Sequence, residues 1–545
     1  MKKPRILLLA VVLLALLSVC TIVVPSVVNR SFTDHGLFEE EENEEEEERE
    51  SGADKQLSMW FQARAYPDPT YLNEKFFKAW QHAQAMKFEI PDRFSSRVTY
   101  GSWTSLGGPT IGRVLSIAVH PTISGTVFIG SASGGIWKTQ NGGANWGFVE
   151  TGLPVLGVPT IAIHPTNPSI ILAGTGEVYR VDTSNMGYNV WKARGTYGIG
   201  IVRSTDGGLT WTQVMNRNES QLFGVQMIKY DPSNPSIVYA CTTNGLYKST
   251  DAGATWGASP ILNKIYVSDV VVNSANSNLI MATVGNLVNP DKGIYRSTDG
   301  GVTWTKVSSA AFPATAYGFG RFGYISGNTV IAKLNVDETG SSNELFRSTD
   351  FGVTWSVLAS SHQSQYQFWF CNALAINPAN TNQIIAGGVS LYRYTVGTGQ
   401  SNITGSMHAD FHDAEFDPLN SNTLYIACDG GMYKSTNAQA ASPTFSQINT
   451  GLVISQFYSS FGVSKTTANR YVGGLQDNGV WAYNGTWSQR FGGDGGACAI
   501  NPVNDANVFA SNDARRVSRS MGGITGAYSQ VLASWGFTGD DRTAF

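Results

Sequence analysis

The chain has 545 residues, enough for several domains or one long repeat array. It contains 59 glycines, 11% aromatic residues and only 14% charged residues. This composition excludes a coiled coil, disfavours a helical bundle and suits short strands joined by tight turns. The formal net charge is −4, but many of the glutamates lie in one tract, Glu39–Glu50, so the rest of the chain is nearly neutral. A near-neutral body argues against nucleic acid as a partner.

Residues 1–30 have the pattern of a targeting segment. Lys2, Lys3 and Arg5 precede an apolar run from Ile6 to Val24. A basic start before an apolar run is typical of an export signal, and the run approaches the roughly 20 residues that span a bilayer. A cleaved signal and an uncleaved membrane anchor both remain open. Either predicts a secreted or cell-envelope protein, with membrane contact at the N-terminus if the segment is kept.

Two short regions separate this segment from the repeats. Residues 31–58 contain the glutamate tract, which repels itself and predicts a disordered acidic linker. Across residues 59–98, apolar side chains recur at three- and four-residue steps between Tyr71 and Met86. That spacing predicts an amphipathic helix that packs on the body.

The cysteines after the N-terminal segment predict neither a disulfide framework nor a zinc site. They are widely spaced, none forms a C-x-x-C pair, and each lies in an apolar stretch. We therefore expect buried free thiols at Cys241, Cys371, Cys428 and Cys498.

A short motif, S-T-D-x-G-x-T-W, repeats through the rest of the chain. The Asp-Gly turn needs a positive φ, which glycine supplies, and the tryptophan is expected to anchor the hairpin between neighbouring units. A weaker copy ends at Trp146, and a decayed copy lies near Asn437. The motif's structural residues are Asp206, Trp211, Asp251, Trp256, Asp299, Trp304, Asp350 and Trp355.

A second motif, an apolar strand ending in His, Asp or Asn followed by Pro, precedes each copy, as at Ile117–Pro121 and Ile161–Pro165. One unit of about 45 residues then contains four short strands, the last ending in Trp, which is the pattern of a propeller blade. The fold class is therefore all-β, a β-propeller of four-stranded blades over residues 99–545. We count about nine units, in one large or two smaller propellers, the last one incomplete. The chain stops without an evident closing blade, which predicts truncation or closure by a strand near Trp103.

The repeats resemble the Asp-box, or BNR, repeat of sialidases, xyloglucanase-type glycoside hydrolases and sortilin-type domains. The stretch from Trp103 to Val531 resembles the sortilin-like BNR propeller proteins of exported bacterial systems, especially those of Bacteroidetes. The resemblance implies propeller architecture and is nearly silent on function. It rests on the repeats and on Gly112–Val114, Gly134–Lys138, Gly174–Glu177, His408–His412, Gly474–Gly479 and Gly493–Gly496.

His408, Asp410 and His412 form an H-x-D-x-H cluster. In an extended strand these three side chains would share one face and could bind a divalent metal. The alternative is a hydrogen-bonded polar cluster that lines the propeller channel.

A second polar group consists of Gln476, Asp477 and Asn478 together with Asp494, all flanked by glycines. It predicts either a pair of tight turns or a ligand-binding or catalytic group at the channel mouth. Glu177, which follows Gly174-Thr-Gly176, is a further isolated carboxylate.

Glycoside hydrolysis needs two carboxylates roughly 5 to 10 Å apart. The candidate catalytic residues are Asp410, Asp477, Asp494 and Glu177, and the sequence also offers Glu415 and Asp429. The xyloglucanase-type pattern implies an acidic residue just before the Gly-Gly of the first blade, where this chain has Ser133. The arginine set that a resemblance to sialidases would imply is not recognisable in Arg113, Arg180, Arg203 and Arg321.

The main prediction is an exported or surface-anchored propeller that binds polypeptide or glycan ligands through His408, Asp410, His412, Gln476, Asp477, Asn478 and Asp494. Aromatic residues Tyr366, Phe368 and Trp369 could stack on a sugar or grip a peptide, or belong to the blade core. The alternative is a carbohydrate-active glycoside hydrolase that uses carboxylates at the channel mouth. The sequence requires no cofactor beyond a possible divalent metal.

Overall fold

The computed structural model describes most of the chain between residues 106 and 532. Within that span it leaves out 155–156, 179, 183–188, 193–197, 218–222, 286–288, 290, 314–317, 336–342, 363–370 and 513–515. The predictions for residues 1–30 and 31–58, and for the aromatic residues between 366 and 369, lie outside the described residues. In the predicted helical segment five residues are described, all helical and exposed: Lys75, Lys78, Ala79, Gln81 and His82.

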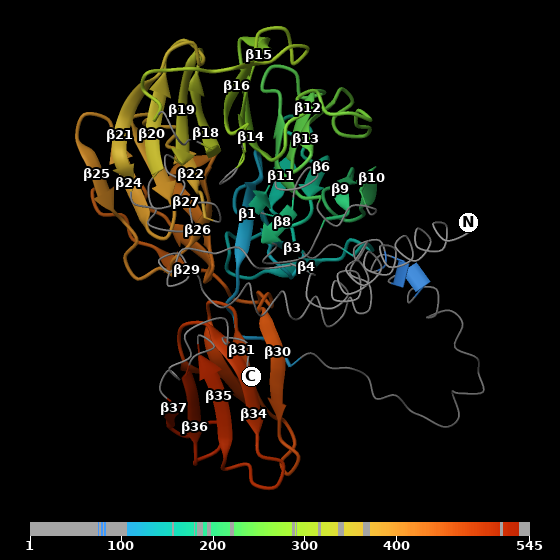
Figure 1. Cartoon of the computed structure of the whole chain (residues 1–545), viewed down its shortest axis with the longest axis vertical. Helices are drawn as coiled ribbons and strands as arrows, with labels where there is room; N and C mark the ends of the chain where they lie inside the picture. Colours follow the sequence, from blue (N-terminus) through green and yellow to red (C-terminus); the bar gives the residue numbers. More distant parts are fainter. Residues whose placement is uncertain are drawn as a thin grey trace, which may run out of the picture. The chain divides into compact units, whose positions relative to one another are not determined.

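The repeats fold into antiparallel sheets, as predicted (Figure 1). The described residues form eight four-stranded sheets, one three-stranded sheet and a separate hairpin. No helix among them is long and apolar enough to cross a membrane. The first four sheets and the hairpin comprise β1 (Val114–Val119), β2 (Val127–Ser131), β3 (Ile136–Thr139), β4 (Gly147–Val149), β5 (Thr160–Ile163), β6 (Ile171–Gly174), β7 (Arg180–Asp182), β8 (Asn189–Lys192), β9 (Gly200–Ser204), β10 (Thr212–Asn216), β11 (Val225–Tyr230), β12 (Val238–Thr242), β13 (Gly245–Ser249), β14 (Val267–Asn273), β15 (Asn276–Val284), β16 (Gly293–Ser297) and β17 (Thr305–Lys306).

The remaining five sheets follow the same order, each strand pairing with the next along the chain. They comprise β18 (Gly318–Ser326), β19 (Thr329–Asn335), β20 (Asn343–Ser348), β21 (Ser356–His362), β22 (Leu374–Ile376), β23 (Gln383–Gly387), β24 (Leu391–Thr395), β25 (Gly399–Asn402), β26 (Phe411–Asp417), β27 (Asn420–Cys428), β28 (Gly431–Ser435), β29 (Ser446–Gln447), β30 (Phe457–Val463), β31 (Arg470–Leu475), β32 (Gly479–Asn484), β33 (Trp487–Phe491), β34 (Gly495–Ile500), β35 (Val508–Asn512), β36 (Arg516–Ser520) and β37 (Tyr528–Leu532).

The first seven sheets close into a ring. Their first strands contact one another in the order β1, β5, β11, β14, β18, β22, β26, and β26 returns to β1. In Figure 1, β1 (blue) lies beside β26 and β27 (orange). Two carboxylates of β26 complete the join, because Asp413 Oδ2 accepts the Ile117 N–H at 2.9 Å and Glu415 Oε2 accepts the Val119 N–H at 3.4 Å. The described sheets therefore include one seven-bladed propeller. The repeat count had left one large propeller or two smaller propellers open, and the ring contains seven of the nine sheets.

The seven first strands line a central channel of about 650 Å³. Five of these strands, all except β14 and β18, come from the motif that ends in proline, and Pro121, Pro165, Pro378 and Pro418 line the channel with them. Proline stops the strand because it offers no N–H to the ladder. The channel wall is apolar along β1 and β5 and charged along β11, β14 and β18, where Lys229 Nζ lies 2.7 Å from Asp269 Oδ1.

The Asp-box residues form the loop between the third and fourth strands of a blade. In the second blade, Asp206 Oδ1 accepts the Ser204 hydroxyl at 2.8 Å and the Thr210 N–H at 2.9 Å, and Gly207 and Gly208 have positive φ. Trp211 is buried against the first blade, as predicted for the anchor. Trp211 lies just before the fourth strand, β10. The prediction of a strand that ends in tryptophan is therefore wrong, because the tryptophan belongs to the Asp-box loop.

A cation on the third strand of most blades bonds to the Asp-box loop of the next blade, a contact that the sequence analysis missed. Lys138 Nζ donates to Gly207 O at 3.3 Å, and Lys248 Nζ donates to Gly300 O at 3.1 Å. The seventh blade continues the series back to the first, because Lys434 Nζ donates to Gly142 O at 3.2 Å. The Lys or Arg in G-[LI]-Y-[KR]-S therefore helps to set the blade order around the ring.

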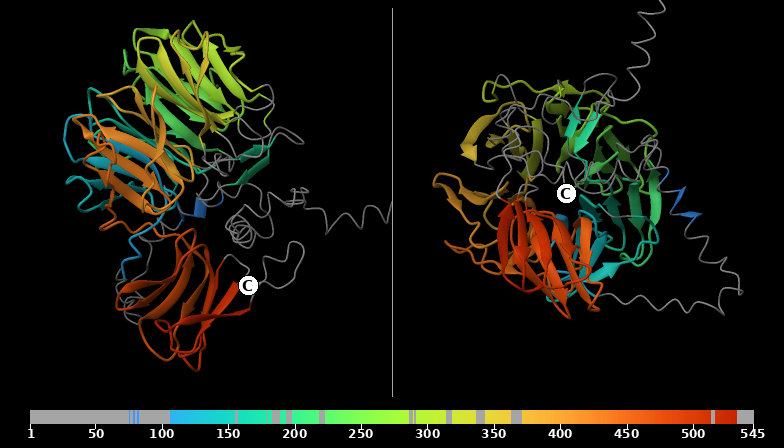
Figure 2. Two further views of the ribbon diagram at one scale, coloured as in Figure 1. Left: turned by 90° about the vertical axis from the view of Figure 1, so that its left-hand side faces the viewer. Right: turned by 60° about the horizontal axis from the view of Figure 1, so that its bottom comes forward.

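The last two sheets, β30–β33 and β34–β37, pack on each other (Figure 2). Val472, Val480, Cys498 and Val508 form their shared core. The last sheet has four strands, so the expectation of an incomplete last unit is wrong; the three-stranded sheet among the described residues is β11–β13. The cysteines are free and buried as predicted, at Cys241, Cys371, Cys428 and Cys498.

Candidate functional site

The two polar groups singled out in the sequence lie together in the structure. The loop before β26 carries His408 and Asp410, and the turn between β31 and β32 carries Asp477. His408 Nε2 lies 3.1 Å from Asp477 O, so these segments touch although they belong to different sheets. We use the name junction cluster for His408, Asp410, His412, Asp429, Gln476, Asp477, Asn478 and Asp494.

Asp429, in the turn between β27 and β28, is the deepest member of the junction cluster. It is fully buried, and its Oδ1 lies 2.5 Å from His412 Nε2. Its backbone oxygen accepts the Asn478 side-chain N–H at 3.1 Å. Burial, followed by the charge of Asp477, raises the pKa of Asp429 well above its ordinary value. The surroundings of Asp429 therefore favour its protonated form.

Asp477 and Asp494 connect the last two sheets to the cluster. Asp477 is half-buried, and its backbone N–H donates to Asp494 Oδ1 at 2.7 Å. Asp477 has φ of 56°, so the expected tight turn is present, and the turn also carries a member of the cluster. On the other side, His408 packs against Gly430, where a Cβ would lie 2.3 Å from the Cβ of His408 and 2.8 Å from its ring atom Cγ. Only glycine at position 430 lets His408 reach the cluster in this way.

The metal site predicted from His408, Asp410 and His412 rests on a wrong geometric assumption. β26 begins at Phe411, and Asp410 has φ of 67°, so the three residues are not in one extended strand and need not share a face. His412 Nε2 is taken by Asp429, and Asp410 Oδ1 accepts the Cys371 thiol at 3.6 Å. Throughout the part of the chain that the structure describes, no group of three His, Cys, Asp or Glu side chains could hold a metal ion.

Glu177 has a different role from that of a solvent-facing acid. Its carboxylate is fully buried and pairs with Arg113 through both oxygens, with Arg113 Nη2 at 2.9 Å from Oε2. Arg113 Nη2 also lies 3.3 Å from Gln456 Oε1, just before β30. Arg113 lowers the pKa of Asp429, against the larger effects of burial and Asp477. The ion pair therefore supports the junction cluster from the side of the first blade.

Several buried polar atoms of the cluster make no hydrogen bond within the described residues. They are Asn478 Oδ1 and both amide atoms of Gln476, a side chain that is 1% exposed. Buried polar atoms are satisfied in nearly all folded proteins, by protein, water or ligand. This set contains donors and acceptors, so it suits a partner that both donates and accepts hydrogen bonds, such as water or a sugar hydroxyl.

Asp429 is one of the carboxylates that the sequence offers, but it was not predicted as a site residue. A usable signal was present, because Asp429-Gly430-Gly431 repeats the pattern of Asp494-Gly495-Gly496. Both aspartates lie beside backbone that approaches closely, where glycine leaves room. The contribution of Arg113 was also missed, since its partner Glu177 is far away in the sequence.

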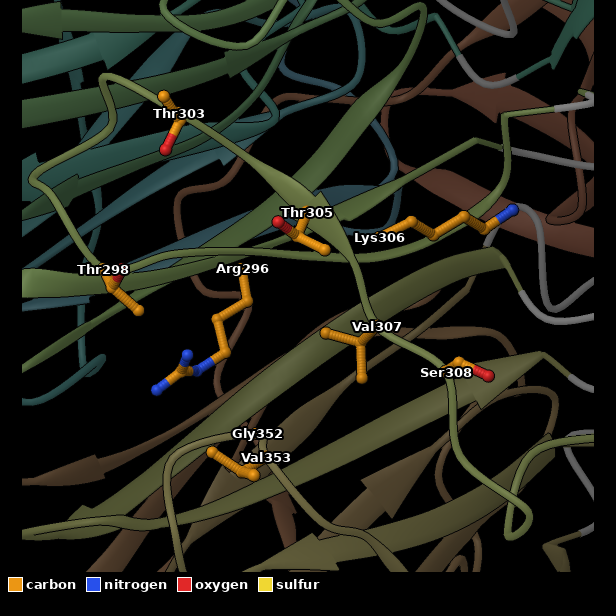
Figure 3. Close-up of a pocket in the computed structure, with 9 residues that line it drawn as sticks. All are labelled: Arg296, Thr298, Thr303, Thr305, Lys306, Val307, Ser308, Gly352 and Val353. Atoms are coloured by element: carbon orange, nitrogen blue, oxygen red, sulfur yellow. The ribbon is translucent and has the colours of Figure 1, made fainter.

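A pocket of about 270 Å³ between the fourth and fifth blades has none of these properties (Figure 3). Figure 3 shows Arg296 extending toward Gly352 and Val353, and its Nε donates to Phe351 O at 2.7 Å. Arg296 thus makes one of the blade-to-blade contacts of the ring. The residues that line this pocket include no carboxylate, so the pocket lacks the carboxyl pair that glycoside hydrolysis needs.

The repeats and the ring define an Asp-box, or BNR-type, β-propeller protein, as the sequence resemblance implied. A family model described as sortilin, neurotensin receptor 3 (Sortilin-Vps10) matches residues 200–341. Among solved structures, the GH74 enzyme of Niastella koreensis is 19% identical with a TM-score of 0.55, covering 79% of this chain and 67% of that one. The GH74 xyloglucanase of Xanthomonas campestris is 13% identical with a TM-score of 0.54, covering 81% of this chain and 83% of that one.

Curated relatives give a consistent class at modest identity. A xyloglucanase of Hypocrea jecorina is 27% identical over 266 residues, which are 42% of this chain and 29% of the relative. A probable oligoxyloglucan-reducing end-specific xyloglucanase of Neosartorya fischeri is 30% identical over 95 residues, which are 16% of this chain and 12% of the relative. The matches thus span less than a third of the length of these relatives. In fold, the propeller is glycoside-hydrolase-like.

Proposed function

We propose that this protein acts on a glycan as a glycoside hydrolase, with the junction cluster as its acid–base group. The observation that carries the proposal is the buried Asp429 carboxyl, whose pKa is raised by burial and by the charge of Asp477, beside buried polar atoms of Gln476 and Asn478 that make no hydrogen bond within the described residues. A glycosidase needs one carboxyl group that is protonated at working pH and a second that is ionised. The similarity to GH74 propellers and xyloglucanases supports a glycan as the substrate class.

The roles follow from burial. Asp429 is fully buried and cannot reach a polymer, whereas Asp477 is half-buried at the edge of the cluster. We therefore assign Asp477 as the proton donor to the glycosidic oxygen. Asp410 and Asp494 are the candidates for the base that takes a proton from water, and single variants distinguish them.

A panel of polysaccharides tests the proposal, with xyloglucan, mixed-linkage β-glucan, cellulose and xylan as members and release of reducing ends as the readout. We expect the wild-type protein to cleave at least one polymer and Asp477→Asn to lose that cleavage. Asp505→Asn, in the loop between β34 and β35 and outside the junction cluster, is the matched control and should retain it. If the wild-type protein cleaves no member of the panel, the hydrolase proposal is overturned.

A second candidate function is glycan binding without cleavage. It is favoured by Ser133, which occupies the position where the xyloglucanase-type pattern has an acid. The neighbouring Ala132 donates its N–H to Arg113 O at 3.1 Å. Affinity electrophoresis with the same polymers measures binding independently of cleavage. If the protein binds but does not cleave, and Ser133→Asp introduces cleavage, the chain is a binding module derived from a hydrolase architecture.

Polymeric glycans lie outside the cytoplasm, which agrees with the predicted signal or anchor at residues 1–30. Localisation of the protein in the secreted or envelope fraction would support this part of the proposal. Recovery in the cytoplasmic fraction alone would oppose it.

A further inference from the structure

One face of the sheet β30–β33 carries aromatic side chains from all four of its strands. Residues that pair across antiparallel strands lie on the same face of a sheet. Tyr483, for example, pairs with Tyr471 on one side and with Trp487 on the other. We use the name aromatic face for Phe457, Phe461, Tyr471, Trp481, Tyr483 and Trp487.

The rings of the aromatic face form a continuous surface. The Tyr483 ring centroid lies 5.8 Å from that of Tyr471 and 5.2 Å from that of Trp487. The Phe457 centroid lies 5.2 Å from that of Phe461 and 5.5 Å from that of Trp487. Gly473, on β31, makes room for both phenylalanines, because a Cβ there would lie 2.6 Å from the Phe461 ring and 2.7 Å from the Phe457 ring.

The opposite face of the same sheet is aliphatic and is already packed. Val472 and Ala482, which alternate with residues of the aromatic face, form a core with Val508 of the last sheet. On the aromatic face, by contrast, Phe461 is 40% exposed and the adjoining Val463 is 44% exposed. A contiguous apolar surface that reaches solvent commonly marks a binding site. The aromatic face therefore differs from the packing surface between the last two sheets in both composition and exposure.

We propose that the aromatic face binds a neutral polysaccharide whose pyranose rings carry equatorial hydroxyl groups. Such rings present C–H groups above and below their plane, and these pack on aromatic rings, while tyrosine hydroxyls and the indole N–H supply polar contacts. No residue of the aromatic face carries a charge, and neither do Val463 and Gln489, which pair with its members. The face thus matches a neutral polymer rather than an acidic one. The inference goes beyond the proposed function, because this surface holds a polymer and takes no part in cleaving it.

The aromatic face continues into the junction cluster along β32. Trp481 Nε1 donates to Asn478 O at 2.8 Å, and Gln489 Nε2 donates to the same oxygen at 3.2 Å. Asn478 belongs to the junction cluster, and β32 begins at the next residue, Gly479. One polymer chain can therefore contact both surfaces. This continuity favours a glycan over a second copy of the chain as the occupant.

Affinity electrophoresis with hydroxyethylcellulose, a soluble and neutral β-glucan, tests the proposal. The full chain carries Asp477→Asn in every sample, so that cleavage does not remove the polymer. We expect Trp487→Ala and Phe461→Leu each to weaken binding about tenfold. Phe461→Leu keeps an apolar side chain and removes only the ring, so its effect reports stacking. Trp487→Phe should retain most of the affinity. Phe148→Ala, which removes a 54%-exposed ring from β4, is the matched control and should bind as tightly as the parent.

Two results of the binding measurement overturn the inference. One is a parent protein that does not bind hydroxyethylcellulose, and the other is undiminished binding by the Phe461 and Trp487 variants. Thermal unfolding shows whether each variant is folded. If Trp487→Ala does not unfold cooperatively, Phe461→Leu decides alone, because its side chain is 40% exposed.

Sedimentation equilibrium tests the competing occupant. A concentration-dependent dimer that Phe461→Leu abolishes would assign the aromatic face to a second copy of the chain and overturn the inference. Reducing-end assays of the protein with Asp477 intact keep the two proposals apart. Binding through the aromatic face without cleavage of any polymer refutes the proposed function alone. Cleavage combined with undiminished binding by the variants refutes this inference alone.

Discussion

Aspartates occupy two contrasting regions of this propeller, the Asp-box loops and the junction cluster. In the fourth blade, Asp299 accepts the Ser297 hydroxyl at 2.8 Å and the N–H and hydroxyl of Thr303 at 2.9 and 2.5 Å. The hydrogen bonds from Thr303 and Ser297 lower the pKa of Asp299 to about 2. Asp429 instead lies beside His412 of a neighbouring strand, and burial, followed by the charge of Asp477, raises its pKa.

This contrast in hydrogen bonding separates the aspartates that stabilise the fold from those that are available for chemistry. An Asp-box satisfies its carboxylate within eight residues of sequence, and it does so in the same way from blade to blade. The junction cluster assembles from segments of at least two sheets and leaves buried polar atoms without partners in the described residues. Substitutions in the two regions should therefore affect different measurements, and the following experiments test that separation.

The largest expected effect is on catalysis, from Asp477→Asn. Loss of a general acid should lower kcat by about 10²- to 10⁴-fold. Asp299→Asn removes a carboxylate of the same size from an Asp-box and should leave kcat unchanged. Initial rates on the cleaved polysaccharide, compared at equal concentrations of folded protein, measure both. Equal losses in the two variants would contradict the separation between building and reacting aspartates.

Arg113→Met should cause the largest loss of stability. Glu177 would be left fully buried with an uncompensated charge, a change that costs about 3–5 kcal/mol of unfolding free energy. The double variant Arg113→Met/Glu177→Leu removes both charges and should recover most of that loss. Urea unfolding monitored by tryptophan fluorescence measures the three proteins. A double variant no more stable than Arg113→Met would mean that the pair contributes through packing rather than charge.

Lys333 gives a pH-dependent test away from the Asp-boxes. Burial lowers the pKa of this 1%-exposed lysine to about 7, while its Nζ donates to Gly387 O. Because the unfolded chain binds this proton up to about pH 10.5 and the folded chain does not, stability should rise between pH 7 and 10, by about 3–4 kcal/mol. Lys333→Met should remove this rise.

Urea unfolding at pH 7 and pH 10 provides the measurement for Lys333→Met, and the exposed Lys465→Met is its control. The control should keep the pH dependence of the wild-type protein. A wild-type stability that is flat or falls over this interval would contradict the assignment of a neutral buried lysine.

Much of the propeller could be predicted from the sequence because its determinants are local. The Asp-box, the strand that ends in proline and the glycines with positive φ each act within one unit, so periodicity identifies the blades. The closure of seven sheets could not be predicted, since it depends on contacts such as Trp146 Nε1 to Ile448 O, which join distant parts of the chain. These long-range contacts decide that seven sheets form the ring and that the last two sheets pack on each other.

The candidate site could be predicted only in part, for a related reason. The residues around Asp410 and Asp477 were recognisable as polar groups among glycines, but their convergence depends on how the sheets pack. The metal hypothesis failed because alternation was assumed across Asp410, whose positive φ interrupts it. Asp429 was overlooked because its partner His412 is a neighbour across a sheet and not along the sequence.

The smallest expected effect concerns an Asp-box that departs from the rule. Two of the four copies with an aspartate have glycine after it, with φ of 75° at Gly207 and 73° at Gly300, whereas the third blade has Ala252 at φ 55° and the fifth has Phe351 at φ 53°. An L-residue in this conformation costs about 1–2 kcal/mol of stability. Glycine removes that cost, but the larger conformational entropy of the unfolded chain with glycine cancels part of the gain. Ala252→Gly should therefore stabilise the protein by about 0.5–1 kcal/mol, whereas Ala254→Gly in the same loop, which does not have a positive φ, should not. Chemical unfolding of the two variants against the wild type decides, and a destabilised Ala252→Gly would mean that the Ala252 methyl group contributes packing that outweighs its backbone strain.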